Sequence, residues 1–396
     1  MLERARAAMR QRRWGDAFAN LSAADREASL DSPDVEHLAM TAYLVGRDDD
    51  SADAWARAHR IHLNAGDAER AARCAFWMGF GLLDRGETAQ GAGWLARARR
   101  LLDDGNRDCV EQGYLLVPVG IRCVREGDDA AAYAAFVKAS TIGRRFGDPD
   151  LMAMALNGEG RALIRGGDIE HGVTLLDEAM VAVTAGEVSP AVVGGVYCSV
   201  IEGCHEIFDL RRAHEWTTAL GEWCGAQPDL VPYRGRCLVH RAEILRFHGA
   251  WTDALDEGVR ARDRLSRPTP KPAVGAAYSL LAALPRLRGE FEAAEAAYRE
   301  ASRWRRPDPG LALLRLVQGD IAAAAGAINR AASEVQSAAS RVPILAAQVE
   351  IAIAAQDVST AGRAAAELAA IAGRFDAPLL DAVSSQAEGA VSLAAG

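Results

Sequence analysis

The chain has 396 residues, half of them hydrophobic and a quarter charged, with a formal net charge of -9 at pH 7. This balance is typical of a folded protein that buries a core, and it argues against intrinsic disorder. The acidic net charge argues against a surface dominated by phosphate contacts, because nucleic-acid affinity comes largely from Lys and Arg. We therefore expect no direct nucleic-acid binding by this segment.

The N-terminus and the apolar stretches indicate the cellular compartment in which the chain is expected. Residues 1–6 lack the apolar core of a signal peptide, which predicts a cytoplasmic protein. The apolar stretch 344–355 is interrupted by Gln348 and Glu350, and no stretch reaches the roughly 18–20 residues of a bilayer span. The seven cysteines lack any C-x2-C spacing, so we expect reduced buried thiols and no metal site.

A marker residue, most often a glycine followed by an acidic or small residue, recurs about every 40 residues. The markers are Gly86, Gly127, Gly167, Phe208, Gly249, Gly289, Gly319 and Gln356, and the register extends upstream to Arg12 and Arg47. A small residue stands five places after each of the eight markers from Gly86 to Gln356. These small residues are Gly91, Ala132, Gly172, Ala213, Ala254, Ala294, Ala324 and Ala361. Seven places before the markers, most residues are small again, as at Gly79, Gly120 and Gly160.

After each marker the residues five, nine and twelve places on tend to read small, large, small, as at Gly91, Leu95 and Ala98. These positions are four and seven residues apart and fall on one face of an α-helix. Each marker therefore predicts a turn between two helices whose small residues let them approach closely. The turns fall near 12, 47, 86, 127, 167, 208, 249, 289, 319 and 356, and an unpaired helix follows over 379–395. Asp308 and Arg315 stand where apolar residues are expected, which predicts a short first helix in the ninth hairpin.

A hairpin of this size cannot bury its apolar face alone, so the hairpins must stack into one continuous core. We predict a single all-α domain over 1–396, a right-handed superhelical solenoid of about ten hairpins. Prolines at 149, 190, 228, 232, 268, 270, 272, 307 and 309 are expected between hairpins. The unpaired last helix either caps the array or indicates a fragment of a longer chain, and its apolar end, with Val391 and Leu393, favours the fragment.

The small-large-small second helices and small-residue first helices resemble tetratricopeptide repeats, with a period longer than the usual 34 residues. Five stretches resemble the sensor region of large actinobacterial LuxR-type transcription regulators with MalT-like repeats. They are AARCAFWMGFGLLDRGE (71–87), LLDEAMVAVTAGEVSP (175–190), EIFDLRRAHEW (206–216), PDLVPYRGRCLVHRAEI (228–244) and HGAWTDAL (248–255). Such regulators carry a helix-turn-helix domain after the repeats, and this sequence has none. The resemblance therefore implies an effector-sensing module detached from that domain, or a stand-alone relative.

In tetratricopeptide arrays the first helices line the concave groove, and the resemblance implies which side chains point into it. These are Phe76, Phe80, Tyr114, Asn157, Arg161, Glu202, His205, Glu206, Arg236, Glu243 and Arg246. The last three belong to a first helix expected from about 232 to 248. The lining would change from aromatic to charged along the groove, which suits a small amphipathic effector or an extended peptide.

The motifs argue against an enzyme. His205-Glu206 and His214-Glu215 lack the second histidine of H-E-x-x-H, and neither lysine follows a glycine as in a Walker A loop. No G-x-S-x-G elbow occurs. We expect a non-enzymatic regulatory module without a cofactor. Two alternatives stay open: a protein-protein interaction scaffold, and a hydrolase or isomerase whose site pairs Glu202 or Glu206 with His240.

Overall fold

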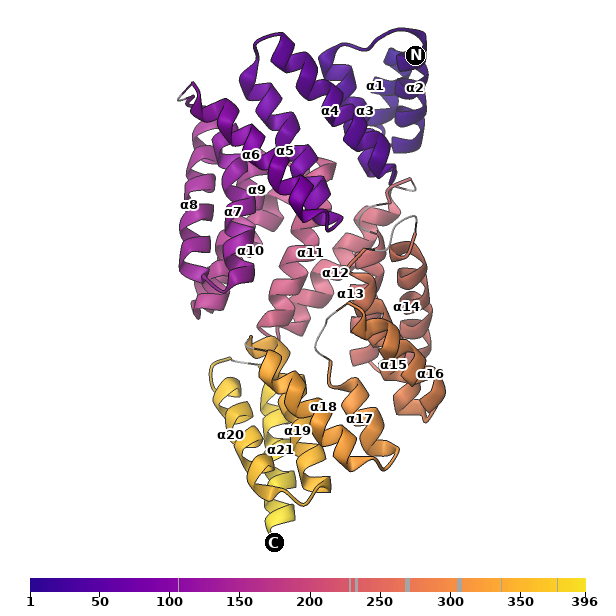
Figure 1. Ribbon diagram of the computed structural model, residues 1–396, viewed down its shortest axis with the longest axis vertical. Coiled ribbons are helices and arrows are strands. Elements are labelled where there is room, and N and C mark those ends of the chain that lie inside the picture. Colours follow the sequence, from indigo (N-terminus) through magenta and orange to yellow (C-terminus); the bar gives the residue numbers. More distant parts are fainter. Residues whose placement is uncertain are drawn as a thin grey trace. The chain divides into compact units, whose positions relative to one another are not determined.

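The computed structural model describes residues 1–105, 107–227, 229–231, 234–267, 271–304, 308–335, 337–375 and 377–396. In these ranges the chain forms only helices and turns, which confirms the all-α prediction (Figure 1). The helices fall into two compact units, where the sequence analysis expects one repeat domain. Unit 1 comprises Met1–Val200 and Thr218–Arg234, and unit 2 comprises Ile201–Thr217 and Gly235–Gly396.

The helices follow one another as pairs joined by short turns. The pairs are α1 (Leu2–Arg10) and α2 (Trp14–Glu27), α3 (Ser32–Leu44) and α4 (Asp48–Asn64), α5 (Ala68–Asp84) and α6 (Thr88–Asp103), α7 (Glu111–Glu126) and α8 (Asp129–Phe146), α9 (Pro149–Gly166) and α10 (Ile169–Thr184), α11 (Pro190–Glu206) and α12 (Leu210–Gly225), α13 (Arg234–Phe247) and α14 (Trp251–Leu265), α15 (Val274–Arg288) and α16 (Phe291–Ser302), α17 (Gly310–Val317) and α18 (Ile321–Glu334), and α19 (Ala338–Ala354) and α20 (Val358–Ala372). The last helix, α21 (Pro378–Ala395), follows α20.

Each first helix ends at a residue in the left-handed backbone conformation. These residues are Arg12, Gly46, Gly86, Gly127, Gly167, Phe208, Gly249, Gly289, Gly319 and Gln356, with φ from 56° to 99°. In the second hairpin this residue is Gly46, one position before the expected Arg47. Glycine adopts the conformation without steric cost, which explains why the repeat is most visible as a glycine period.

The small residues lie where the two helices of a hairpin cross. A Cβ on Gly91 would lie 2.9 Å from the carbonyl oxygen of Gly79, and a Cβ on Gly160 would lie 2.6 Å from that of Gly172. These pairs occupy the positions seven before and five after the marker. The alanines that replace glycine in later hairpins, such as Ala254 and Ala294, have no exposed surface. The helices of the two glycine hairpins, α5–α6 and α9–α10, therefore touch through main-chain atoms.

First helices also contact the first helix of the next hairpin: α5 contacts α7 and α7 contacts α9 in unit 1, and α15 contacts α17 and α17 contacts α19 in unit 2. Each unit thus presents a row of first helices. In unit 1 the segment after α12 returns to the N-terminal hairpins. The Val231 amide donates to the Leu44 carbonyl at 2.9 Å, and the Trp14 indole donates to Gln227 at 2.9 Å.

Prolines begin three of the helices that follow a hairpin, α9 at Pro149, α11 at Pro190 and α21 at Pro378. The expected boundary prolines 228, 232, 268, 270 and 307 lie outside the described residues, as does Tyr233. Helix α17 is short, and Asp308 accepts from the Gly310 amide at 2.7 Å before its start. Arg315 on that helix reaches out to Glu295 at 2.7 Å, which explains a charge at an expected apolar position.

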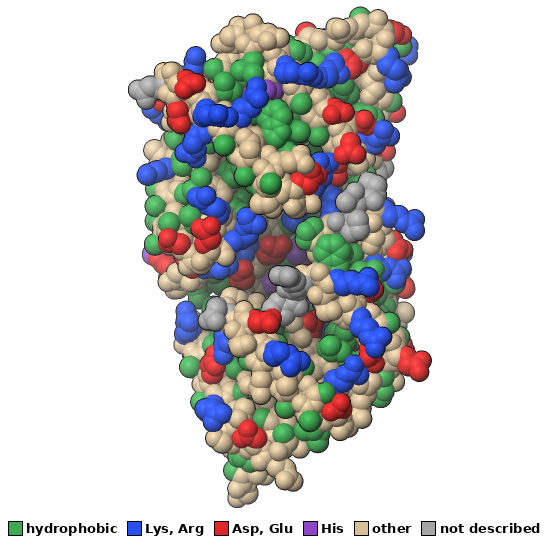
Figure 2. Space-filling model, viewed as in Figure 1, with side chains coloured by type: hydrophobic (Ala, Val, Ile, Leu, Met, Phe, Trp, Pro, Cys, Tyr) green, Lys and Arg blue, Asp and Glu red, His purple; other side chains and the backbone are tan. Residues whose placement is uncertain are grey.

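All seven cysteines are free thiols, and all but Cys123 are buried. No helix in the described part of the chain combines the length and apolar character that a membrane span needs. The surface carries interspersed acidic and basic side chains on the face seen in Figure 2.

The glycine crossing predicts opposite effects for two substitutions on α6. Gly91→Ala places a methyl group against the Gly79 carbonyl and the Leu83 side chain, so we expect the free energy of unfolding to fall by about 1–3 kcal/mol. Gly93→Ala meets nothing within 4 Å and should raise it by about 0.5–1 kcal/mol, because alanine favours the helix. Urea unfolding followed by circular dichroism measures both. Equal effects at the two positions would contradict a close crossing.

The left-handed Gln356 predicts a stabilising substitution. Its φ is 60° and its side chain is exposed, so Gln356→Gly should relieve strain and raise the free energy of unfolding by about 0.5–1 kcal/mol. Phe208→Gly is the contrast, since Phe208 has a φ of 59° but packs its ring 5.7 Å from that of Phe375. Chemical denaturation should show that loss of this packing outweighs the relief of strain at Phe208.

Candidate functional site

The aromatic residues expected in the groove form a cluster between α5 and α7 of unit 1. The Phe76 ring lies 5.1 Å from Tyr114 and 5.4 Å from Phe80, and Trp77 lies 6.1 Å from Tyr114. Phe76 and Tyr114 are each only 1% exposed. Their rings therefore belong to the core between hairpins, and Phe80 and Trp77 are the members of the cluster that keep partial exposure.

A charged network that the sequence analysis missed surrounds Tyr114. The Arg73 guanidinium lies over the Tyr114 ring at 4.0 Å and contacts Glu111 at 3.1 Å and Asp148 at 3.4 Å. The Tyr114 hydroxyl donates to Asp148 at 2.8 Å, and Asp148 also accepts from the Leu151 amide at 2.9 Å as the N-cap of α9. Burial raises the pKa of Tyr114, which keeps the phenol protonated as a donor. The network ties α5, α7 and α9 together.

Asn157 and Arg161 on α9 meet at Ser199 of α11. Asn157 donates to the Ser199 hydroxyl at 3.0 Å, and Arg161 donates to the Ser199 carbonyl at 2.6 Å. The Asn157 carbonyl oxygen Oδ1 is buried and has no hydrogen-bond partner among the described residues. An N–H group of a ligand can donate a hydrogen bond to a buried acceptor of this kind.

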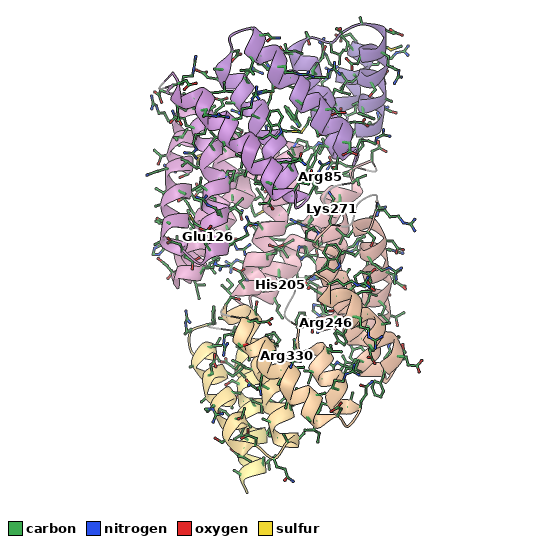
Figure 3. All side chains as sticks on the ribbon, viewed as in Figure 1. Arg85, Glu126, His205, Arg246, Lys271 and Arg330 are labelled. Carbon is green, nitrogen blue, oxygen red and sulfur yellow. The ribbon has the colours of Figure 1, made fainter. Side chains whose placement is uncertain are left out.

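In unit 2 the predicted charged residues gather around His205. Burial lowers the pKa of His205 most strongly; Glu243 and Glu202 raise it, and His240 and Arg246 lower it. The ring is therefore predominantly neutral at pH 7, and its Nε2 is buried without a hydrogen-bond partner in the described part of the chain. Figure 3 labels His205 on α11 and Arg246 on α13. Glu206 and Arg236 are partly exposed, and each makes interactions of its own.

The acid and base that the enzymatic alternative requires involve His240. Its ring centroid lies 6.3 Å from that of His205, and its Nδ1 lies 3.9 Å from the Glu243 carboxylate. The latter distance exceeds a hydrogen bond. The enzymatic alternative instead pairs His240 with Glu202 or Glu206, and that pairing stays a prediction. His240 is 7% exposed, while Glu202 is exposed.

The comparisons with known proteins support the fold. No family model and no curated protein matches the chain. Among solved structures, a Rap protein complexed with Competence and Sporulation Factor is 12% identical over 74% of this chain and 80% of that chain, with a TM-score of 0.52. A signal transduction ATPase with a tetratricopeptide repeat sensor, from Pyrococcus horikoshii, is 15% identical over 76% of this chain, with a TM-score of 0.43. Yeast Tom70 is 12% identical over 99% of this chain and 94% of that chain, with a TM-score of 0.43.

This chain spans 47% of the length of the Pyrococcus protein. The similarity to the Rap protein shows a tetratricopeptide-like helical fold. A LuxR-type or MalT-like origin is not shown by these neighbours.

The network around Tyr114 predicts that Asp148 contributes more than a helix cap. Asp148→Ala removes the cap of α9, the acceptor of the Tyr114 hydroxyl and a partner of Arg73, so we expect the free energy of unfolding to fall by about 2–4 kcal/mol. Asp128→Ala is the matched control, because the exposed Asp128 caps α8 through the Ala131 amide at 2.9 Å. It should cost about 1 kcal/mol. Similar losses in thermal and urea unfolding would show that the network adds nothing.

Proposed function

We propose that this chain is a non-enzymatic sensor module of a transcription regulator that binds a small effector or an extended peptide along its first helices. The support is a repeat fold whose first helices lie in a row within each unit, together with the resemblance to LuxR-type sensor regions. The observation that carries the proposal is a pair of buried polar atoms on these helices, Asn157 Oδ1 and His205 Nε2, which have no hydrogen-bond partner among the described residues.

In unit 1 the ligand surface consists of Phe80 and Trp77 on α5 and the polar group of Asn157, Arg161 and Ser199. Partly exposed aromatic rings offer apolar contact area, and a small number of polar groups fix the orientation of the ligand. Asn157 uses its amide N–H on Ser199, so its Oδ1 suits an N–H donor such as a peptide amide. Arg161 adds a positive charge beside it.

In unit 2 the ligand surface is more strongly charged. His205 offers a neutral imidazole, and Glu202, Glu243 and Arg246 lie close enough to influence its protonation. Carboxylates in this number favour a ligand with a cationic or hydrogen-bond-donating group. Within unit 1, Phe76 and Tyr114 support the ligand surface of that unit from the core rather than by contact with the ligand.

The Rap protein with the same kind of fold was solved with Competence and Sporulation Factor bound, so the architecture accommodates a bound factor. Binding would act by favouring one of several arrangements of stacked hairpins. A ligand shifts such an equilibrium only by the difference in its affinity for the two states.

A protein-interaction scaffold is the second candidate, and one observation favours it. Exposed apolar side chains flank the left-handed turns of three successive hairpins in unit 2: Phe247, Trp251, Leu287, Val317 and Ile321, each 37–52% exposed. A row of apolar side chains at a repeat edge is suited to contact with another protein.

A binding screen followed by two substitutions tests the proposal. The purified chain is screened by thermal shift against host metabolites and a library of short peptides, and compounds that raise the melting temperature are titrated by calorimetry. We expect Asn157→Ala or His205→Ala to weaken binding about 10-fold, because each removes a hydrogen bond worth about 1–1.5 kcal/mol. Whichever variant weakens binding assigns the ligand to unit 1 or unit 2.

Arg122→Ala is the control, since Arg122 is 61% exposed on α7. Unchanged affinity in both test variants would contradict the proposed surfaces. A silent screen, together with a stoichiometric protein partner whose binding is lost on Leu287→Glu, would support the scaffold instead.

A further inference from the structure

Three side chains of metal-binding type converge in unit 1. Glu36 on α3, His62 on α4 and Cys74 on α5 place one ligand atom each within 4.8 Å of one another. The His62 Nε2 lies 2.7 Å from a Glu36 carboxylate oxygen. Cys74 has no exposed surface and His62 is 6% exposed, so the cluster differs from the acidic groups that commonly gather on surfaces.

The spacing is close to that of a tetrahedral zinc site. Zinc binds sulfur at about 2.3 Å and nitrogen or oxygen at about 2.0–2.2 Å, so the ligand atoms of such a site lie about 3.3–3.8 Å apart. The Glu36 and His62 atoms would separate slightly to admit an ion, and the thiol would approach by a small side-chain movement. Glu36 is 19% exposed and sits at the water-accessible side of the cluster.

A second observation concerns the other nitrogen of His62. Its Nδ1 lies 3.7 Å from a carboxylate oxygen of Asp67, which is within ion-pair range but longer than a hydrogen bond. Metal-binding histidines usually donate their second N–H to a carboxylate, which fixes the ring and strengthens the ligand. Asp67 is itself held in place, because its other oxygen accepts from the Arg70 amide at 3.0 Å as the N-cap of α5.

We propose that Glu36, His62 and Cys74 bind a divalent transition metal ion, with Zn²⁺ the best match, and leave a fourth position for water or a further ligand. Thiolate and imidazole together select Zn²⁺ over Mg²⁺ or Ca²⁺, which prefer oxygen ligands. The ion would link three consecutive helices, α3, α4 and α5, across two hairpins. Without a metal ion, the role of Glu36 is limited to the hydrogen bond that it makes with the buried His62.

Two features oppose the ion, and both can be overcome. The Arg70 guanidinium lies 3.5 Å from Glu36, but its side chain is 59% exposed and can turn into water. Burial raises the pKa of the Cys74 thiol, so the ion must displace a proton to bind. Zinc sites pay this cost routinely, because the metal-thiolate bond is strong.

Zinc and cobalt titrations of the chelator-treated full chain test the site. We expect one equivalent of Zn²⁺ to bind in competition with a chromogenic chelator. Co²⁺ should give the near-ultraviolet charge-transfer band of a thiolate ligand. Cys74→Ser should abolish the band and weaken Zn²⁺ binding by more than about 100-fold, the loss expected for a metal ligand rather than a supporting residue. Cys109→Ser, which changes another buried cysteine of unit 1, should leave both readouts intact.

Two further variants keep the test decisive if Cys74→Ser fails to fold. Glu36→Gln keeps the size of the side chain and a hydrogen bond to His62, and it should also weaken Zn²⁺ binding about 100-fold. Asp67→Asn keeps the helix cap and should weaken binding about 10-fold. The proposal is overturned if the folded wild-type chain takes up no stoichiometric Zn²⁺, or if Glu36→Gln binds it with unchanged affinity.

Discussion

The close approach of two helix backbones, shown by the α5–α6 and α9–α10 hairpins, is the constraint on which the rest of the structure depends. Gly79 faces the carbonyl of Gly91, and Gly160 faces that of Gly172, at distances that leave no room for a side-chain carbon. Such a crossing fixes the separation and direction of the paired helices, because main-chain atoms cannot change rotamer. Each hairpin then offers the next one a surface of defined shape. The row of first helices, and every side chain placed on it, follows from that geometry.

The period of this crossing is visible in the sequence because it restricts residue size. The turn positions follow from the same register, including Phe208 and Gln356, where the left-handed conformation occurs without glycine. Local signals also placed the start of α9 at Pro149 and the shortness of α17. The second turn was expected near Arg47 and lies at the adjacent Gly46, because glycine adopts the left-handed conformation without steric cost.

Contacts between side chains distant in sequence were not predictable from the pattern. Phe76 and Tyr114 were assigned to a ligand surface from their positions on first helices, and the structure buries both under Arg73 and Asp148. The partners in that network are separated by up to 75 residues, so no local period reveals them. The hydrogen bond between Val231 and Leu44 likewise joins residues far apart in sequence, so the repeat pattern does not reveal it. The same holds for the convergence of Glu36, His62 and Cys74, which lie on three different helices.

Main-chain contact at the crossings has a consequence for how such a chain evolves. The atoms that touch there are common to all amino acids. A crossing therefore requires a small residue at a few positions and does not restrict the residue type at positions outside the crossing. Most outward-facing positions can drift while the pitch of the hairpins is preserved. A shared fold with the Rap protein at only 12% identity is consistent with so few restricted positions. New binding specificities can then arise by surface substitution alone, without rebuilding the framework that displays them.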